Sequence, residues 1–228
     1  MMVTTNIILS EKKWNRELVS SLTNHYKHSK WKLINNKKDF RLEVLDKLNV
    51  GKIFIPHWSH IIPEDIFKKY ECIVFHMTDL PFGRGGSPLQ NLIIRGFKET
   101  KISALKVKEG LDTGPIYLKE KLTLEGTAKE ILQRSSRIIF KMILKILENE
   151  ISPISQSGES IIFKRRKPGE SNIIELKEIN QIFDYIRMLD CDGYPKAFIE
   201  NEYIKFEFSK AELKSKNKLI ANVRIFKK

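Results

Sequence analysis

The sequence predicts an α/β protein whose mostly parallel sheet carries helices on both faces, followed by a small α+β appendage. Two observations lead to this prediction. Short apolar runs alternate with segments of helical periodicity through the first part of the chain. A linker rich in serine, with proline and glycine, residues 151–158, then precedes the tail. We therefore expect one domain over residues 1–150 and a second, smaller one over residues 159–228.

Four short apolar runs have the length and composition of buried strands. They are Asn6–Leu9, Trp31–Ile34, Lys52–Ile55 and Cys72–Phe75. Three segments with apolar residues at helical spacing lie between them, namely Trp14–Leu22, Phe40–Leu48 and Pro63–Tyr70. Because parallel strands need crossover connections of this kind, the order favours a parallel sheet.

The chain beyond Pro81 is expected to change character. Loop-forming residues dominate Pro81–Pro88. A short helix, two strands around the turn Glu109–Gly114 and a long helix follow: Leu89–Gly96, Ile102–Val107, Pro115–Leu124 and Thr127–Asn149. Thr127 and Glu130 have the spacing of a capping box at the start of the long helix. The tail is expected to hold a strand, a helix and a hairpin: Ile161–Arg165, Ile179–Leu189, and Ala197–Glu200 paired with Tyr203–Phe208.

The composition disfavours several classes of protein. No stretch approaches the roughly 20 apolar residues that a membrane span needs, and the amino terminus lacks the layout of a secretory signal. Two cysteines, Cys72 and Cys191, cannot form a disulfide framework. We therefore expect a cytoplasmic protein without a membrane partner. The net charge of +13 is spread along the chain, so it fits either an anionic partner or lysine-rich solvation.

The first expected strand is followed by Ser10–Lys13, a segment without glycine. Dinucleotide-binding and P-loop folds need a glycine-rich phosphate turn at that place, so both are disfavoured. Glycines occur instead around Arg84, in Gly83–Gly86. Backbone amides and a guanidinium there could approach an anion closely. The alternative is a flexible loop with a solvated arginine.

Two residues are candidates for proton transfer. His76 stands where an apolar strand meets a loop, the kind of edge at which open α/β sheets bind ligands. Its ring can exchange protons near neutral pH, although a histidine at a strand end is also often structural. Asp112 lies in a loop between two expected strands, where a carboxylate can equally cap a turn. His57 and His60 follow another strand, and because no third ligand is near them we expect an aromatic pocket wall rather than a zinc site.

Several motifs follow the expected strand that ends in His76. In order, they are Leu80-Pro81, Arg84-Gly85, Pro88, Gly96 and Leu111-Asp112-Thr113-Gly114-Pro115-Ile116, all within residues 50–150. This order resembles the formyltetrahydrofolate-dependent formyltransferases, which act on glycinamide ribonucleotide, methionyl-tRNA or nucleotide sugars. His76 and Asp112 are 36 residues apart (112 − 76), in agreement with the family pattern. The tail segment 185–198 is similar to the appendage of the tRNA and sugar branches.

The resemblance implies a formyltransferase-type, Rossmann-like fold with a catalytic domain over residues 1–150, and N10-formyltetrahydrofolate as formyl donor without a metal. It implies catalytic roles for His76 and Asp112, and we add Asn91 and the backbone amides of Gly83–Gly86 as candidate oxyanion donors. The folate pocket is expected to be formed by Pro56, His57, Trp58, Ile62, Leu111, Thr113 and Gly114. The acceptor is expected to be bound by Thr78, Arg84, Gly85, Gly86, Arg165 and Arg166.

One departure from the family pattern concerns the oxyanion. The family has an asparagine two residues before its histidine, and this chain has Val74, which cannot donate a hydrogen bond. The run from His76 to Asn91 resembles a branch that formylates an amino sugar in pseudaminic-acid biosynthesis. We therefore expect a nucleotide-linked amino sugar as acceptor, no nucleic-acid partner, and a homodimer as one option. The alternatives are a methionyl-tRNA formyltransferase-like enzyme and a non-catalytic relic that binds folate or sugar.

Overall fold

The computed structural model describes residues Val3–Lys228, and these form two compact units. The first unit comprises the described residues up to Arg84 together with Lys101–Leu122 and Gln133–Ile162. The second comprises Gly85–Thr100, Thr123–Leu132 and Phe163–Lys228. Two segments inside the expected 1–150 domain thus group with the carboxy-terminal residues.

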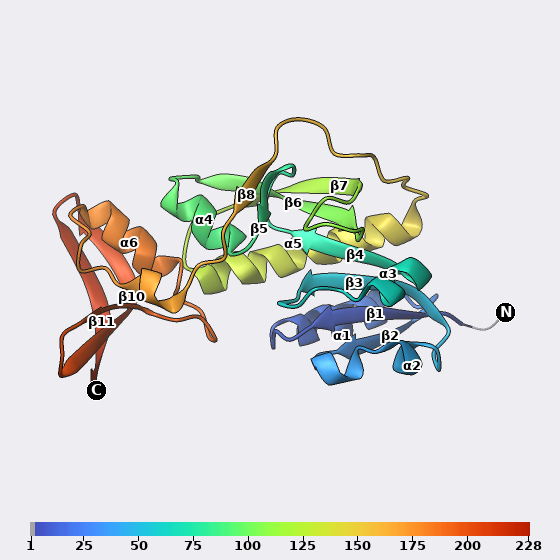
Figure 1. Ribbon diagram of the computed structural model, residues 1–228, viewed down its shortest axis with the longest axis horizontal. Coiled ribbons are helices and arrows are strands. Elements are labelled where there is room, and N and C mark those ends of the chain that lie inside the picture. Colours follow the sequence, from blue (N-terminus) through green and yellow to red (C-terminus); the bar gives the residue numbers. More distant parts are fainter. Residues whose placement is uncertain (1–2) are drawn as a thin grey trace. The chain divides into compact units, whose positions relative to one another are not determined.

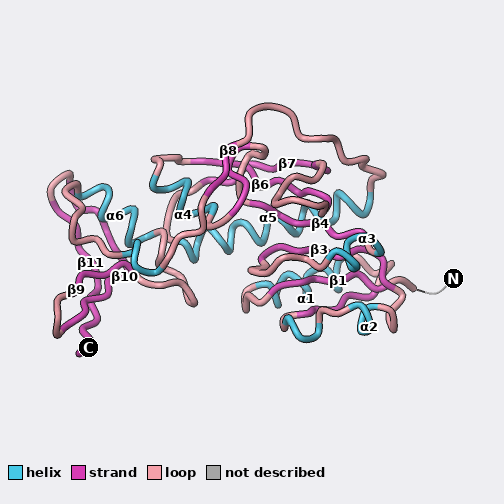
Figure 2. Tube along the Cα trace, in the orientation of Figure 1, coloured by secondary structure: helices cyan, strands magenta, loops and turns pink. Residues whose placement is uncertain are grey.

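The first unit is built on a six-stranded sheet of order β2-β1-β3-β4-β6-β7 (Figures 1 and 2). Its strands are β1 (Thr5–Ser10), β2 (Lys30–Ile34), β3 (Val50–His57), β4 (Glu71–His76), β6 (Glu99–Lys106) and β7 (Ile116–Thr123). β1 pairs in parallel with β2 and β3, and β3 pairs in parallel with β4. β4 and β6 are antiparallel. The prediction of a mostly parallel sheet is confirmed.

Helices follow the first three parallel strands: α1 (Asn15–His25), α2 (Leu42–Leu45) and α3 (Glu64–Lys69). The chain moves from β1 outward to β2 and then back past β1 to β3. Right-handed connections therefore place α1 on one face of the sheet and α2 and α3 on the other. Leu45 and Ile66 of the latter helices pack with Ile7 in one buried cluster. Ile8 and Phe54, which point to the opposite face, are fully buried as well.

The long helix α5 (Ala128–Glu148) starts at the expected capping box. The Thr127 amide donates to Glu130 Oε2 at 2.8 Å, and the Glu130 amide donates to Thr127 Oγ1 at 3.3 Å. From Gln133 onward the helix belongs to the first unit. There the Ser136 hydroxyl donates to Asn15 Oδ1 at 3.2 Å, which ties α5 to α1.

The second unit contains two helices and an antiparallel sheet of order β11-β10-β9. Its elements are α4 (Pro88–Ile94), α6 (Ile179–Arg187), β9 (Ala197–Glu200), β10 (Ile204–Ser215) and β11 (Lys218–Lys227). The expected hairpin is present as β9 and the start of β10, whereas β11 was not predicted.

A two-stranded sheet of β5 (Phe82–Gly85) and β8 (Ile161–Phe163) replaces the expected loop around Arg84. None of the helices between residues 3 and 228 has the length and apolarity to cross a bilayer.

Candidate active site

The carboxyl ends of β1, β3 and β4 bring three polar residues to one edge of the sheet. Ile55 of β3 lies opposite Val74 of β4 in parallel register, so His57 and His76 end neighbouring strands. Ser10 of β1 pairs with His57 in the same way. Open α/β sheets bind ligands at such an edge, so the register alone marks it as the candidate site.

His76 is buried, and both of its ring nitrogens face polar groups. Nε2 lies 2.7 Å from the Gly83 carbonyl oxygen. Because a carbonyl only accepts, Nε2 carries a proton and donates it. Nδ1 lies 3.5 Å from Asp112 Oδ2. The chain therefore brings together two residues that are 36 positions apart, and a proton taken up at Nδ1 would face a carboxylate.

The loop between β6 and β7 holds Asp112 in a left-handed backbone conformation, with φ of 53°. Such a φ is uncommon outside glycine, and Asp and Asn tolerate it best. Two residues further, Gly114 packs so tightly that a Cβ would lie 1.7 Å from the Lys106 carbonyl oxygen. Thr113 closes the turn, since its hydroxyl donates to the Glu109 carbonyl at 2.8 Å. The expected folate-binding residues Thr113 and Gly114 thus have structural roles in the loop.

Gln156 is a residue of this site that sequence reasoning missed. Its side-chain amide donates to the carbonyls of Asp112 and Gly114, at 2.8 Å each. Its oxygen accepts from the Arg84 guanidinium at 3.2 and 2.8 Å. Gln156 lies in the segment predicted as a linker, and nothing in its local sequence signals a partner 44 residues away.

A hydrogen-bond network orders the expected pocket wall around His57. The Asn15 side chain donates to Ser10 Oγ at 2.8 Å and lies 3.2 Å from His57 Nδ1. The Ser10 hydroxyl donates to the His57 carbonyl at 3.1 Å. Burial, aided by the charge of Lys12, lowers the pKa of His57 to about 4, so its ring is neutral at pH 7. Since Nδ1 accepts from Asn15, Nε2 carries the hydrogen.

Two donors in this wall are buried without a protein partner. They are His57 Nε2 and Trp58 Nε1. Buried polar groups in folded proteins are nearly always hydrogen-bonded, so each of these N–H groups can donate to an acceptor on a ligand or on water. Pro56 and Ile62 nearby are buried. Leu111 is 61% exposed and Ile61, which sequence reasoning did not select, is 88% exposed.

His60 pairs with Glu11 rather than with His57, and its Nε2 lies 3.0 Å from Glu11 Oε1. Within the described part of the chain, no three histidine, cysteine or acidic side chains gather as ligands for a metal. Thr78, expected to contact the acceptor, is fully buried and donates to the Gly83 carbonyl at 3.2 Å. Its hydroxyl thus supports the same carbonyl that His76 contacts.

The remaining predicted residues lie in the second unit. A Cβ on Gly86 would lie 2.7 Å from Arg165 Cα, so this glycine permits a close backbone approach. The Arg166 guanidinium lies over the Tyr185 ring, 5.3 Å from its centre. Gly85 has a φ of 101°, which glycine adopts without strain.

Asn91, the expected oxyanion donor, is already engaged in the second unit. Its amide contacts the carbonyls of Gly86, Ser87 and Lys164 at 3.0 to 3.1 Å. Its oxygen accepts from Arg95 at 2.8 Å. An amide has two hydrogens, so this geometry favours a structural role for Asn91.

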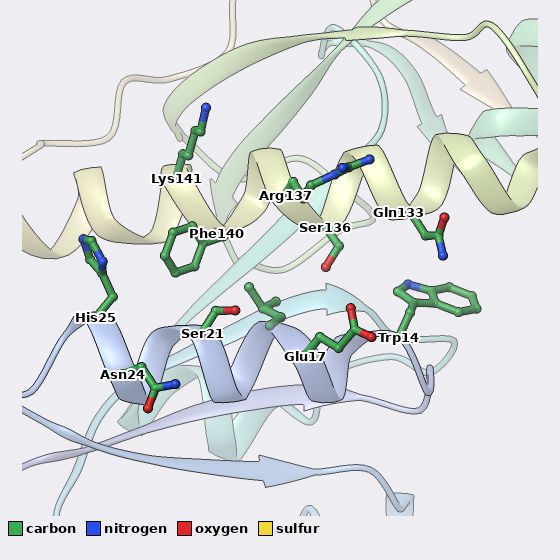
Figure 3. A pocket seen from close by; sticks show the side chains of 11 residues that line it. Trp14, Glu17, Ser21, Asn24, His25, Gln133, Ser136, Arg137, Phe140 and Lys141 are labelled. Carbon is green, nitrogen blue, oxygen red and sulfur yellow. The ribbon is translucent and has the colours of Figure 1, made fainter.

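A groove of about 750 Å³ lies between α1 and α5 (Figure 3). Trp14 stands at one end of it and His25 at the other. None of the predicted site residues lines it. Ser136 on its wall donates to Asn15, which in turn contacts His57.

Residues 8–143 match the sequence model of the family described as "Formyl transferase". The chain belongs to this formyl transferase family. The prediction of a formyltransferase is confirmed at the level of the family. A second family, described as "Methionyl-tRNA formyltransferase, C-terminal domain", matches residues 168–226.

Relatives of this formyl transferase include methionyl-tRNA formyltransferases of Rickettsia. The one from Rickettsia massiliae is 32% identical over 143 residues, 60% of this chain and 47% of its own length. The one from Rickettsia felis is 31% identical over 187 residues, 75% of this chain and 61% of its own length. This chain thus spans about half to three fifths of these curated relatives. A solved methionyl-tRNA formyltransferase from Clostridium thermocellum is 46% identical, with a TM-score of 0.95 over 99% of this chain and 100% of its own.

These comparisons overturn the expected acceptor branch. A nucleotide-linked amino sugar and the absence of a nucleic-acid partner were predicted, and both predictions are wrong. The formyltransferase PseJ from Anoxybacillus kamchatkensis is only 21% identical, with a TM-score of 0.56 over 70% of this chain and 85% of its own. That likeness shows the shared fold alone, whereas the 46% identical structure and the carboxy-terminal family model both belong to methionyl-tRNA formyltransferases.

Proposed function

We propose that this protein transfers a formyl group from N10-formyltetrahydrofolate to the amino group of methionyl-tRNA. The observation that carries the proposal is the 46% identity to the Clostridium thermocellum methionyl-tRNA formyltransferase over nearly the whole chain. The net charge of +13 supports it, because lysines and arginines that neutralise phosphates contribute much of the affinity for a nucleic acid.

In the proposed reaction the methionyl amino nitrogen attacks the formyl carbon and a new N–C bond forms, so the carbonyl oxygen becomes an oxyanion. The bond from this carbon to N10 then breaks. The amine loses one proton and N10 gains one, and the products are formyl-methionyl-tRNA and tetrahydrofolate. His76 moves the proton in this proposal, because an imidazole exchanges protons near neutral pH. The Asp112 carboxylate, 3.5 Å from Nδ1, stabilises the imidazolium that forms when the ring takes up a proton.

We assign the donor to the carboxyl edge beside β3 and β4. The unpartnered N–H groups of His57 and Trp58 support this assignment, because a pterin ring system offers nitrogen and oxygen acceptors. Exposed apolar side chains at Ile61 and Leu111 offer surface that a bound ring would cover. Arg84 is assigned to an anionic part of the acceptor, as the sequence suggested.

Val74 supports a second candidate function, binding without catalysis. It is the residue that stands where the family has an asparagine, and it packs between Ile55 and Leu105 in the sheet. Loss of one oxyanion donor costs about 3 kcal/mol of transition-state stabilisation, a factor of about 10² in rate. Slow transfer is therefore the expectation, and an absence of transfer would favour the binding function.

Mixing the purified protein with N10-formyltetrahydrofolate and methionyl-tRNA tests the proposal. Mass spectrometry of the released methionine should show the addition of one formyl group, and the rate should fall as salt is raised, because phosphate contacts release counterions. Free methionine and uncharged tRNA serve as controls. Equal formylation of free methionine, or near-full activity of His76→Ala, would contradict the proposal.

A further inference from the structure

The Gln156 side chain uses every hydrogen-bonding position it has. An amide offers two hydrogens and two lone pairs. The hydrogens go to the carbonyls of Asp112 and Gly114, and both lone pairs face the Arg84 guanidinium. Carbonyls only accept and a guanidinium only donates, so the orientation of the amide is fixed by its partners.

The backbone next to Gln156 is anchored independently of this side chain. Ile154, two residues earlier, forms an antiparallel pair with Ile116 at the start of β7, with N–O distances of 2.8 and 2.9 Å. The Gln156 amide is thus presented from a fixed position, although the residues around it form no regular element.

Asp112 needs such support because of its conformation. A residue in the left-handed region persists only where its surroundings determine it. Gly114 fixes one side of the loop by its contact with the Lys106 carbonyl. Gln156 holds the carbonyls of Asp112 and Gly114, so a backbone rotation of the loop that carried the carboxylate away from His76 would break at least one of these hydrogen bonds.

We propose that Gln156 is a positioning residue that sets the Asp112 carboxylate against His76. The inference rests on the proposed formyl transfer. Gln156 acts through the backbone of Asp112, because its amide donates to backbone carbonyls and not to the Asp112 carboxylate or the His76 ring. Arg84, on the other side of the amide, keeps its oxygen occupied and thereby keeps the NH₂ group turned toward the loop.

Two substitutions distinguish the hydrogen bonds that the Gln156 side chain donates to the loop from those that it accepts from Arg84. Gln156→Glu keeps an acceptor for Arg84 but removes both donors to the loop, whereas Gln156→Met removes the donors and the acceptor. Gln181→Glu makes the same change of charge at an exposed position of α6 and is the matched control. We expect kcat to fall about tenfold or more in both Gln156 variants, since misplacing a catalytic group by about 1 Å can cost more than that. KM for N10-formyltetrahydrofolate and the melting temperature should stay close to those of the wild type.

Hydrogen exchange gives a readout that does not depend on the reaction. Amides of residues 109–114 should exchange faster in Gln156→Glu than in the wild type or in Gln181→Glu. In an Asp112→Asn background, Gln156→Glu should lower kcat no further, because a residue that acts through another loses its effect with it.

The outcomes are distinct. Unchanged exchange in residues 109–114 would overturn the claim that Gln156 holds the loop, and faster exchange with an unchanged kcat would overturn the positioning role. Full activity of Gln156→Glu beside a defective Gln156→Met would assign the effect to Arg84 instead. A wild type that formylates nothing would overturn the proposed function, while the exchange comparison in the same samples still decides whether Gln156 holds the loop.

Discussion

Asparagine in place of Asp112 removes the charge beside His76 and little else. The two side chains have the same shape, and asparagine is among the residues that tolerate the φ of 53° found there. The pair is largely shielded from water, with side-chain exposures of 8% for His76 and 14% for Asp112. The Asp112→Asn protein should therefore fold with a melting temperature close to that of the wild type.

The size of the effect follows from the distance. At an effective dielectric constant of about 20, unit charges 3.5 Å apart attract each other by about 5 kcal/mol. Measured hydrogen bonds to charged groups contribute about 1.5–3 kcal/mol, and the asparagine oxygen retains part of the interaction. We expect the Asp112→Asn enzyme to lose about 3–4 kcal/mol of transition-state stabilisation, a fall of 10²–10³ in kcat at about 1.4 kcal/mol per factor of ten.

Single-turnover transfer from N10-formyltetrahydrofolate to methionyl-tRNA measures this loss without interference from product release. Asp192→Asn, at an exposed position, is the matched control and should be as active as the wild type. A folded Asp112→Asn enzyme within about threefold of the wild-type rate would refute the ion-pair reasoning, because such a change corresponds to less than 1 kcal/mol.

Three further predictions concern neighbouring residues. Val74→Asn should raise the single-turnover rate by up to about 10², because asparagine restores the oxyanion donor that the family has at this position. A variant that folds stably but reacts more slowly would contradict a role of position 74 in binding the oxyanion. Gly114→Ala should lower the free energy of unfolding in urea by about 1–3 kcal/mol, since its Cβ would lie 1.7 Å from the Lys106 carbonyl oxygen. An unchanged unfolding midpoint would show that the loop can move to accommodate the methyl group without cost. His57, with its pKa lowered to about 4, stays neutral in the folded protein while the unfolded chain takes up a proton below about 6.5. The wild type should thus lose up to about 3 kcal/mol of stability as the pH falls from 6.5 to 4, and His57→Gln should lose less; equal pH profiles of the melting temperature would count against this.

The strands of the first unit could be predicted because their apolar runs are short, β-branched and separated by helical periodicity. Lys52–Ile55 and Cys72–Phe75 lie within β3 and β4 for this reason. β11 was missed because its apolar residues are not confined to one face. Val223 and Phe226 both remain more than 40% exposed, so no clean alternation marked the strand.

Some residues of the candidate site could likewise be predicted from the sequence, and others could not. His76 and Asp112 could be selected because their residue types suit the proposed proton transfer and their separation fits the family pattern, and the structure brings them together. Gln156 could not be selected, because its function lies in contacts with backbone carbonyls, which leave no mark on its own sequence. The acceptor was predicted wrongly from the run that ends at Asn91. That run begins at His76, the residue to which we assign the proton transfer, whereas residues 168–226 match the carboxy-terminal family of methionyl-tRNA formyltransferases.

The four hydrogen bonds of one glutamine amide also matter for anyone who wishes to graft this centre onto another scaffold. A chimera that exchanges only the stretch from His76 to Gly114 would import the histidine and the carboxylate but leave behind the amide that contacts their loop. The segment around Gln156 belongs to the smallest transplantable set, so protein engineers should exchange the two pieces together.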